Sequence, residues 1–171
     1  MKKLIIYTDG ASRGNPGQGA VGVIFCNEKG EVIKKYGKYL GDNVTNNEAE
    51  YEAVIFALKK FNAVFGKKLA ANSEIEIRAD SELLVKQLKG EYKIMNPRMQ
   101  ELFIELWNLK VGFGKVTFRS VPREKNKEAD KMANAFIGAA DKLARALDTD
   151  LGRVKDRNGR ETIRAAAAEQ E

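Results

Sequence analysis

Four acidic residues, each within a short motif of small and polar residues, are the side chains in this sequence best suited to chemistry. They are Asp9, Glu50, Asp80 and Asp130. Each lies where an apolar run typical of a strand ends, or where a run typical of a helix begins, and such junctions can bring distant side chains into one cleft. Carboxylates gathered in one place repel one another unless a hard divalent cation neutralises them. The pattern therefore predicts a magnesium-type site.

Three glutamates lie near the start of the helix predicted from residue 46, and one of them is distinguished by its position on that helix. Glu50 lies three and seven residues before Ala53 and Ala57, so it shares their apolar face and points toward the sheet. Glu48 and Glu52 fall on the flank of the helix, where solvated surface is the expected role. A carboxylate on a buried face is costly unless a cation meets it, which favours Glu50 as the functional acid.

Structural roles compete at the other three positions. Asp130 lies near the start of the last predicted helix, where an acid offsets the helix dipole, although Glu128 is nearer to that start. Asp80 would suit a helix cap, and Asp9 would suit the turn after a strand. No single signal identifies a site. The presence of all four acids in this order, on these elements, favours the metal site.

The composition describes one soluble globular domain with a tail. The chain has 171 residues, 43% of them apolar and 32% charged, and no apolar run reaches the length of a membrane span. The net charge of +6 around an acidic site favours a polyanionic substrate, although a basic surface that aids solubility explains the charge equally well. Cys26 is the single cysteine and there is no histidine to act as its base, which leaves no internal disulfide and suits a reducing cytoplasm.

Hydrophobic periodicity predicts the elements that must position the acids. We expect strands near residues 3–8, 20–26, 32–40, 74–79 and 116–121, and helices near residues 46–61, 81–88, 97–107 and 126–147. Short loops join the first three strands into an antiparallel meander, whereas the later strands alternate with helices. This order predicts an α/β (mixed α+β) fold with a five-stranded mixed sheet, three antiparallel strands then two parallel ones, flanked by helices.

The domain organisation follows from where this pattern fades. We expect a catalytic domain over residues 1–147 and a charged, alanine-rich tail over residues 148–171 that is frayed or partly helical. Within the domain, Trp107 lies in an apolar helical stripe, which favours a place in the core over a base-stacking surface.

The acidic motifs resemble those of the type 1 ribonuclease H family. The matching segments are Tyr7–Ser12 followed by Gly14–Gly17, Thr45–Asn47 with Glu50, Asp80–Ser81, and Asn126 with Ala129–Asp130. The resemblance runs from near Leu4 to near Ile137 and includes the family's five-stranded mixed sheet. It implies an endonuclease that hydrolyses the RNA strand of RNA–DNA hybrids and leaves 5′-phosphate and 3′-hydroxyl ends.

By position, the resemblance makes Asp9, Glu50, Asp80 and Asp130 the metal ligands, with two Mg²⁺ ions in the active complex and Mn²⁺ able to substitute. The chemistry agrees, because two such ions about 3.5–4 Å apart activate a water and stabilise the leaving oxyanion of a phosphodiester. An all-oxygen ligand set without histidine argues against zinc.

Substrate recognition is expected in the minor groove, where 2′-hydroxyls lie on one strand of a hybrid only. Gly10 permits close approach of the backbone to a phosphate or ribose, and asparagine amides both donate and accept. The resemblance places Asn46 and Asn47 in the groove and Thr45 on a phosphate of the DNA strand, although turn or cap roles suit Asn15 and Asn46 as well. The predicted substrate contacts are Gly10, Ser12, Asn15, Thr45, Asn46 and Asn47.

Two features depart from many members of that family. The loop before the last helix carries no histidine, and we hypothesise that Arg123 supplies an electrostatic part of its role without shuttling protons. The basic helix and loop that some members insert after the third motif are also missing, since only a short segment that includes residues 89–93 lies between two predicted helices here. We expect an RNA–DNA hybrid as partner, no membrane, and a cytoplasmic monomer.

Three other functions fit parts of the pattern. A non-catalytic hybrid- or RNA-binding module would keep the fold, but such modules typically lose an acid. A phosphotransferase with an aspartyl nucleophile usually needs a second acid two residues after the first, where this chain has Ala11. An actin-like ATPase half would use the turn at Asp9 for phosphate, but the chain is too short to form two lobes.

Overall fold

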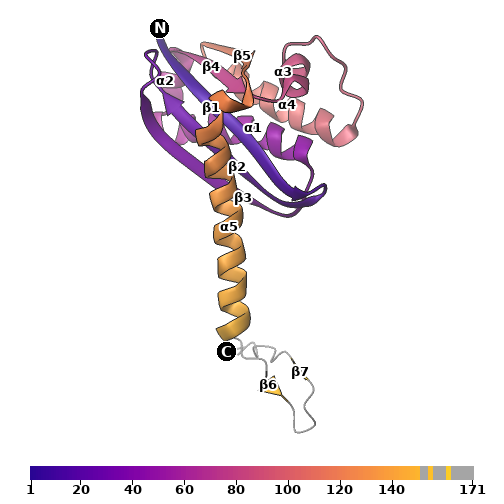
Figure 1. The fold of residues 1–171 in the computed structure, drawn as a ribbon. Coiled ribbons are helices and arrows are strands. Elements are labelled where there is room, and N and C mark those ends of the chain that lie inside the picture. Colours follow the sequence, from indigo (N-terminus) through magenta and orange to yellow (C-terminus); the bar gives the residue numbers. More distant parts are fainter. Residues whose placement is uncertain (151–153, 156–160, 163–171) are drawn as a thin grey trace, which may run out of the picture. The chain divides into compact units, whose positions relative to one another are not determined.

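The computed structural model describes residues 1–150, 154–155 and 161–162, and their side chains up to residue 147 (Figure 1). Its main sheet contains β1 (Lys2–Gly14), β2 (Gly17–Cys26), β3 (Val32–Val44), β4 (Ser73–Ala79) and β5 (Lys115–Ser120). The strand order is β3-β2-β1-β4-β5, with antiparallel pairs on the β3 side of β1 and parallel pairs on the β5 side. The predicted five-stranded mixed sheet is confirmed.

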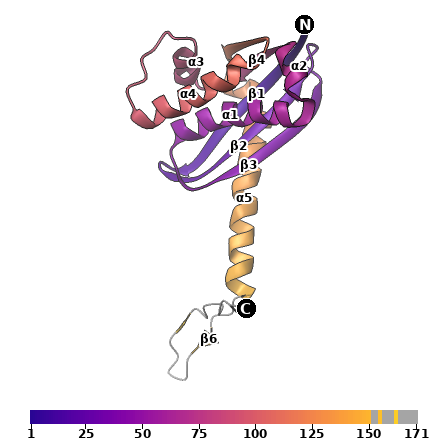
Figure 2. The ribbon, with the colours of Figure 1, turned by 180° about the vertical axis from the view of Figure 1, so that it is seen from behind.

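The described helices flank this sheet. They are α1 (Asn46–Phe65), α2 (Lys67–Ala71), α3 (Glu82–Leu88), α4 (Pro97–Val111), the 3₁₀ turn η1 (Arg123–Lys125) and α5 (Lys127–Asp150). The two opposite views show α1 and α4 on one face of the sheet and the first turns of α5 on the other (Figures 1 and 2). Helix α2 was not predicted, because five residues are too few to show a helical period.

The main core lies between the sheet and α1, α3 and α4. Strand side chains alternate between faces, so Ile6 on β1 and Ile77 on β4 point into this core. Ile5 and Ile24 point to the opposite face, where Ala129 at the start of α5 covers them. Packing on both faces of the sheet fixes β1 and β4, which are adjacent strands inside the sheet. These strands lead to two of the predicted acids.

The start of α5 approaches the sheet closely because β2 and β3 carry glycines beneath it. A Cβ atom on Gly22 would lie 2.1 Å from the carbonyl oxygen of Ala129, and one on Gly37 would lie 2.4 Å from the ring of Phe136. At Gly22 no larger residue fits without moving the helix backbone, and at Gly37 a larger residue would displace the ring of Phe136. This close contact fixes the first turn of α5, which carries Asp130.

Two sequence expectations differ from the structure. The strand expected to end near residue 8 continues to Gly14, because its second half pairs with β2 in a tight hairpin, so Asp9 lies within β1. Trp107 is 50% exposed and stacks on Phe103 instead of entering the core. The buried face of α4 is formed by its neighbour Leu106 and two other residues, and one step along a helix turns Trp107 away from that face.

The chain divides into two compact units, residues 1–137 and residues 138–171. In the second unit, α5 ends at Asp150, and the short strands β6 (Val154–Lys155) and β7 (Glu161–Thr162) pair antiparallel. The predicted frayed or partly helical tail over residues 148–171 otherwise lies outside the described residues. Among the described helices, none combines the length and the apolarity that spanning a bilayer requires.

Candidate active site

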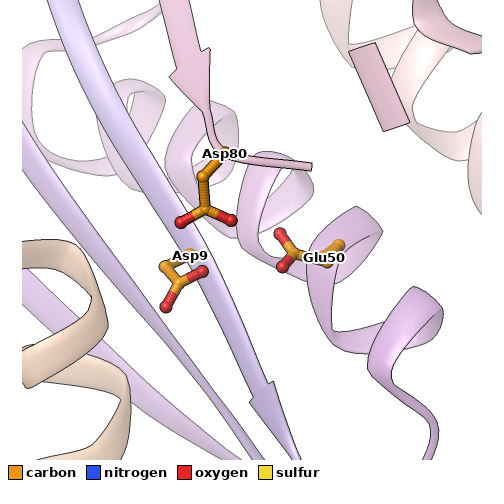
Figure 3. Close-up of side chains that lie close together, drawn as sticks. All are labelled: Asp9, Glu50 and Asp80. Atoms are coloured by element: carbon orange, nitrogen blue, oxygen red, sulfur yellow. The ribbon is translucent and has the colours of Figure 1, made fainter. Parts of the chain in front are cut away.

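Three of the four predicted acids converge from three different elements (Figure 3). Asp9 lies on β1, Glu50 in the second turn of α1 and Asp80 directly after β4, and each offers a carboxylate oxygen within 4.8 Å of the others. The parallel register pairs Tyr7 with Arg78, so two residues further along Asp9 and Asp80 stand side by side. The pairing of the strands therefore accounts for this half of the cluster.

Glu50 joins the cluster because α1 packs directly against β1 at Gly10. A Cβ atom at Gly10 would lie 2.1 Å from the carbonyl carbon of Ala49 and 2.4 Å from the amide nitrogen of Glu50. Only a residue without a side chain allows this approach. Gly10 thus has a structural role in addition to the predicted contact with substrate.

The fourth acid, Asp130, lies in the first turn of α5 and lines the same cavity, whose volume is about 670 Å³. Its carboxylate accepts a hydrogen bond of 3.1 Å from the side-chain amide of Asn134, one helical turn later. Asp130 stands outside the tight group of three acids but close enough to raise the pKa of Asp9.

The surroundings of Asp9 and Glu50 disfavour the ionisation of these two carboxyl groups. Asp9 is only 5% exposed, and burial together with the charges of Glu50 and Asp80 raises its pKa to about 9. Burial and Asp80 raise the pKa of Glu50 to about 8, although a hydrogen bond with the backbone of Gly10 and the charge of Arg123 oppose this. One buried carboxylate oxygen of Glu50 has no hydrogen-bond partner. An all-carboxylate cluster with an unpartnered buried oxygen fits a hard divalent cation.

Arg123 lines this cavity from η1, as Lys127 does from the start of α5. Arg123 lies close enough to Glu50 for its charge to lower the pKa of that carboxyl group. The structure therefore places Arg123 beside Glu50, and its role in the reaction stays a prediction. Its guanidinium offers a fixed positive charge and hydrogen-bond donors but no exchangeable proton at neutral pH.

The predicted substrate contacts divide into two groups. Four of them line the cavity beside the carboxylates, namely Gly10, Ser12, Asn46 and Asn47. The other two lie outside that lining and hold the start of α1. The side-chain oxygen of Asn15 accepts a 3.1 Å hydrogen bond from the backbone amide of Asn46. Thr45 caps α1: its hydroxyl oxygen accepts a 3.2 Å hydrogen bond from the backbone amide of Glu48, and its hydroxyl donates one of 3.2 Å to the Glu48 carboxylate.

Two asparagines at the site have contacts that the sequence did not predict. Asn134 lines the cavity and bonds to Asp130, and their spacing of four residues on one helix was a usable signal. Asn126 is buried and bonds to Asp80. An asparagine before a helix normally predicts a cap, so no sequence signal indicated that this side chain turns inward.

Comparison with known proteins agrees with this geometry. Residues 7–136 match the model of the family described as reverse transcriptase-like. The solved structure of LC11-RNase H1 in complex with an RNA/DNA hybrid is similar over 80% of this chain and 98% of that one, with 43% identity and a TM-score of 0.76. The chain belongs to the ribonuclease H type 1 family. The ribonuclease H fold expected from the sequence is confirmed.

Other members of the ribonuclease H family show the same relationship. Ribonuclease HI of Halobacterium salinarum is 40% identical over 134 residues, and the crystal structure of RNase H1 from that archaeon has a TM-score of 0.73. A bifunctional protein of Mycobacterium tuberculosis is 34% identical over 152 residues. The match spans 64% of the length of the first relative and 40% of the second.

Proposed function

We propose that this member of the ribonuclease H family is an endoribonuclease that hydrolyses the RNA strand of RNA–DNA hybrids and leaves 5′-phosphate and 3′-hydroxyl ends. The observation that carries the proposal is the convergence of Asp9, Glu50 and Asp80 within 4.8 Å, in one cavity with Asp130. The similarity to a ribonuclease H1 solved with an RNA/DNA hybrid supports the choice of substrate. The net charge of +6 supports a polyanionic partner.

We propose Mg²⁺ as the cofactor, two ions in the active complex, with Mn²⁺ as a substitute. Asp9, Glu50, Asp80 and Asp130 would hold them, because hard cations prefer carboxylate oxygens. When bound, the ions would activate a water and stabilise the leaving 3′-oxygen. The backbone elements would contribute a rigid frame, because β1, β4 and α1 hold three carboxylates at fixed spacing before substrate arrives.

Other residues of the cavity are proposed to hold the substrate. Gly10 leaves room for a phosphate or ribose beside Asp9, and the amides of Asn46 and Asn47 suit the minor-groove edges and 2′-hydroxyls. Arg123 would stabilise negative charge near Glu50 during the reaction and assist the departure of product. These contacts would select the RNA strand by its 2′-hydroxyls, without reading sequence.

The remaining predicted contacts are proposed to act at the edge of the cavity. Ser12 donates a 2.7 Å hydrogen bond to the carbonyl oxygen of Val44, which holds the β1–β2 hairpin near the start of α1. Asn15 and Thr45 combine their observed structural bonds with contacts to the substrate backbone. We further propose a monomeric cytoplasmic enzyme with its catalytic domain at residues 1–147, since a buried free cysteine suits a reducing compartment.

A gel assay tests this function. Labelled RNA–DNA hybrid, duplex RNA and single strands are incubated with Mg²⁺ and either the wild-type protein or Asp80→Asn. We expect internal cleavage of the RNA strand of the hybrid by the wild type, and at least a hundredfold slower cleavage by the variant, on the order expected for loss of an essential group. A protein that binds the hybrid and leaves it intact under these conditions would be a non-catalytic binding module instead.

A further inference from the structure

Asn126 occupies an unusual position between η1 and α5. Its backbone carbonyl accepts a 3.2 Å hydrogen bond from Asp130, so it stands where the cap residue of α5 is expected. An asparagine in this place normally turns its side-chain oxygen to the free amides of the first turn. Here the oxygen has no hydrogen-bond partner, and the residue is only 1% exposed. The side chain is directed into the protein and not along its helix.

The side-chain amide of Asn126 uses both of its N–H groups. One donates to the carbonyl oxygen of Thr8 at 2.9 Å, and the other to a carboxylate oxygen of Asp80 at 3.1 Å. Thr8 directly precedes Asp9 on β1, and Asp80 follows β4. One amide group directly before α5 therefore links the backbone beside one acid of the cluster to the carboxylate of another.

This link has an electrostatic consequence. Asp80 faces Asp9 and Glu50, and the repulsion between like charges favours rotation of its side chain out of the site. A hydrogen bond to a charged acceptor contributes about 1.5–3 kcal/mol, which is enough to hold one rotamer. Because the donor is a neutral amide, it holds Asp80 in place without cancelling the charge that a cation needs.

The unpartnered oxygen of Asn126 points to the same role. A buried polar atom without a hydrogen bond costs about 1–3 kcal/mol, so an apolar residue of similar volume would stabilise the fold better at this place. The structure keeps a polar side chain of which only the donor half is used. Packing alone does not explain that choice.

We propose that Asn126 is a positioning residue that orients the carboxylate of Asp80 and sets its separation from Asp9. The inference rests on the proposed function, since it concerns the same cluster of acids. Asn126 is buried and is not among the residues that line the cavity of the acids. It acts through Asp80, as outer-shell groups act on the ligands of other metal sites, where their loss typically weakens metal affinity about 10–100-fold.

Metal affinity without nucleic acid provides the test. Mn²⁺ binding is measured by titration calorimetry on the full chain, for wild type, Asn126→Ala and Asn126→Asp. We expect the dissociation constant to rise about tenfold or more in the alanine variant. The aspartate variant has nearly the same shape, but it has no N–H donor and adds a negative charge beside Asp80. The carboxylate of Asp80 should therefore be repelled and displaced in this variant. A matched control is Asn72→Ala, which removes a 2.9 Å hydrogen bond to Lys68 on a different helix.

The outcomes separate positioning from stability. A variant at Asn126 that unfolds more easily but binds Mn²⁺ within twofold of wild type would overturn the proposal, and so would an equal loss of affinity in the Asn72 control. If the alanine variant does not fold, Asn126→Ser, which keeps one donor, decides in its place: a severalfold loss of affinity supports the role and wild-type affinity overturns it. A wild type that binds Mn²⁺ but cuts no hybrid would refute the proposed function while this comparison still stands.

Discussion

Replacing Asp9 by asparagine is expected to stabilise the metal-free protein, although the same change should remove its activity. Asp9 is buried beside Glu50 and Asp80, and its pKa rises to about 9 from an ordinary value of 3.8. The folded protein therefore binds this proton more tightly than the unfolded chain does. The stability that protonated Asp9 contributes is fully present below about pH 4, falls as the pH rises, and is lost above about pH 9.

The size of the effect follows from the pH interval. Between pH 3.8 and pH 7 the unfolded chain releases a proton that folded Asp9 retains, and each pH unit costs about 1.4 kcal/mol. The upper bound at pH 7 is thus about 4 kcal/mol. Since side chains and water relax around a buried charge, we expect a gain of about 2 kcal/mol for Asp9→Asn. For a chain of this size that corresponds to roughly 4–8 °C in Tm.

Urea unfolding in the presence of a chelator measures this gain at pH 5, 7 and 9. The advantage of Asp9→Asn over wild type should grow with pH, and saturating Mg²⁺ should reverse it by stabilising the wild type alone. Glu28→Gln, which removes an exposed acid from the β2–β3 turn, is the control and should show no such trend. A variant no more stable than wild type at any pH, or a gain independent of pH, would refute the electrostatic reasoning.

Three further substitutions test how the site is positioned. Gly10→Ala places a carbon 2.1 Å from the carbonyl carbon of Ala49, so α1 must shift, and hybrid cleavage in a kinetic assay should fall by roughly a hundredfold. Gly22→Ala places a carbon 2.1 Å from the carbonyl oxygen of Ala129, so α5 must move, and thermal unfolding should show a loss of about 1–3 kcal/mol. Arg123→Ala should slow turnover or product release in stopped-flow measurements, with stability within about 0.5 kcal/mol of wild type. Unchanged kinetics would show that Arg123 has no part in the reaction.

Gly112→Ala is the matched control for the two glycine variants. Its added carbon would meet only the carbonyl oxygen of Leu109 at 3.4 Å, and its φ of −75° suits any residue. It should keep wild-type activity and stability to within about 0.5 kcal/mol. Wild-type behaviour of Gly10→Ala or Gly22→Ala would show that close backbone contact does not set the positions of α1 and α5.

The sheet and the positions of the acids could be predicted because they follow from local patterns. Alternating apolar residues indicate strands, and the acid of α1 could be chosen because Glu50 shares the apolar face of its helix. The short helix α2 left no such pattern. The exposure of Trp107 depends on which side of α4 meets the sheet, which its own stripe does not reveal.

The hydrogen-bond partners of the asparagine side chains could not be predicted from local sequence patterns. The inward turn of Asn126 depends on Thr8 and Asp80, which are 118 and 46 residues away in the chain. Likewise, Asn15 reaches the start of α1 only because the β1–β2 hairpin folds toward it. The tertiary structure sets these hydrogen-bond partners. Sequence motifs therefore indicate which residues belong to the site but not which residues they contact.

The chemistry of the cut ends tests the central claim most directly. An RNA–DNA hybrid labelled on both strands is incubated with the wild-type protein and Mg²⁺, and the ends of the products are determined. Hydrolysis by a water held among the four carboxylates predicts RNA fragments with 5′-phosphate and 3′-hydroxyl ends, an intact DNA strand, and no cleavage with a chelator. Fragments with 2′,3′-cyclic phosphate ends would show that the 2′-hydroxyl attacks in place of water, and equal cleavage with the chelator would show that no metal is needed. Either result would contradict the account.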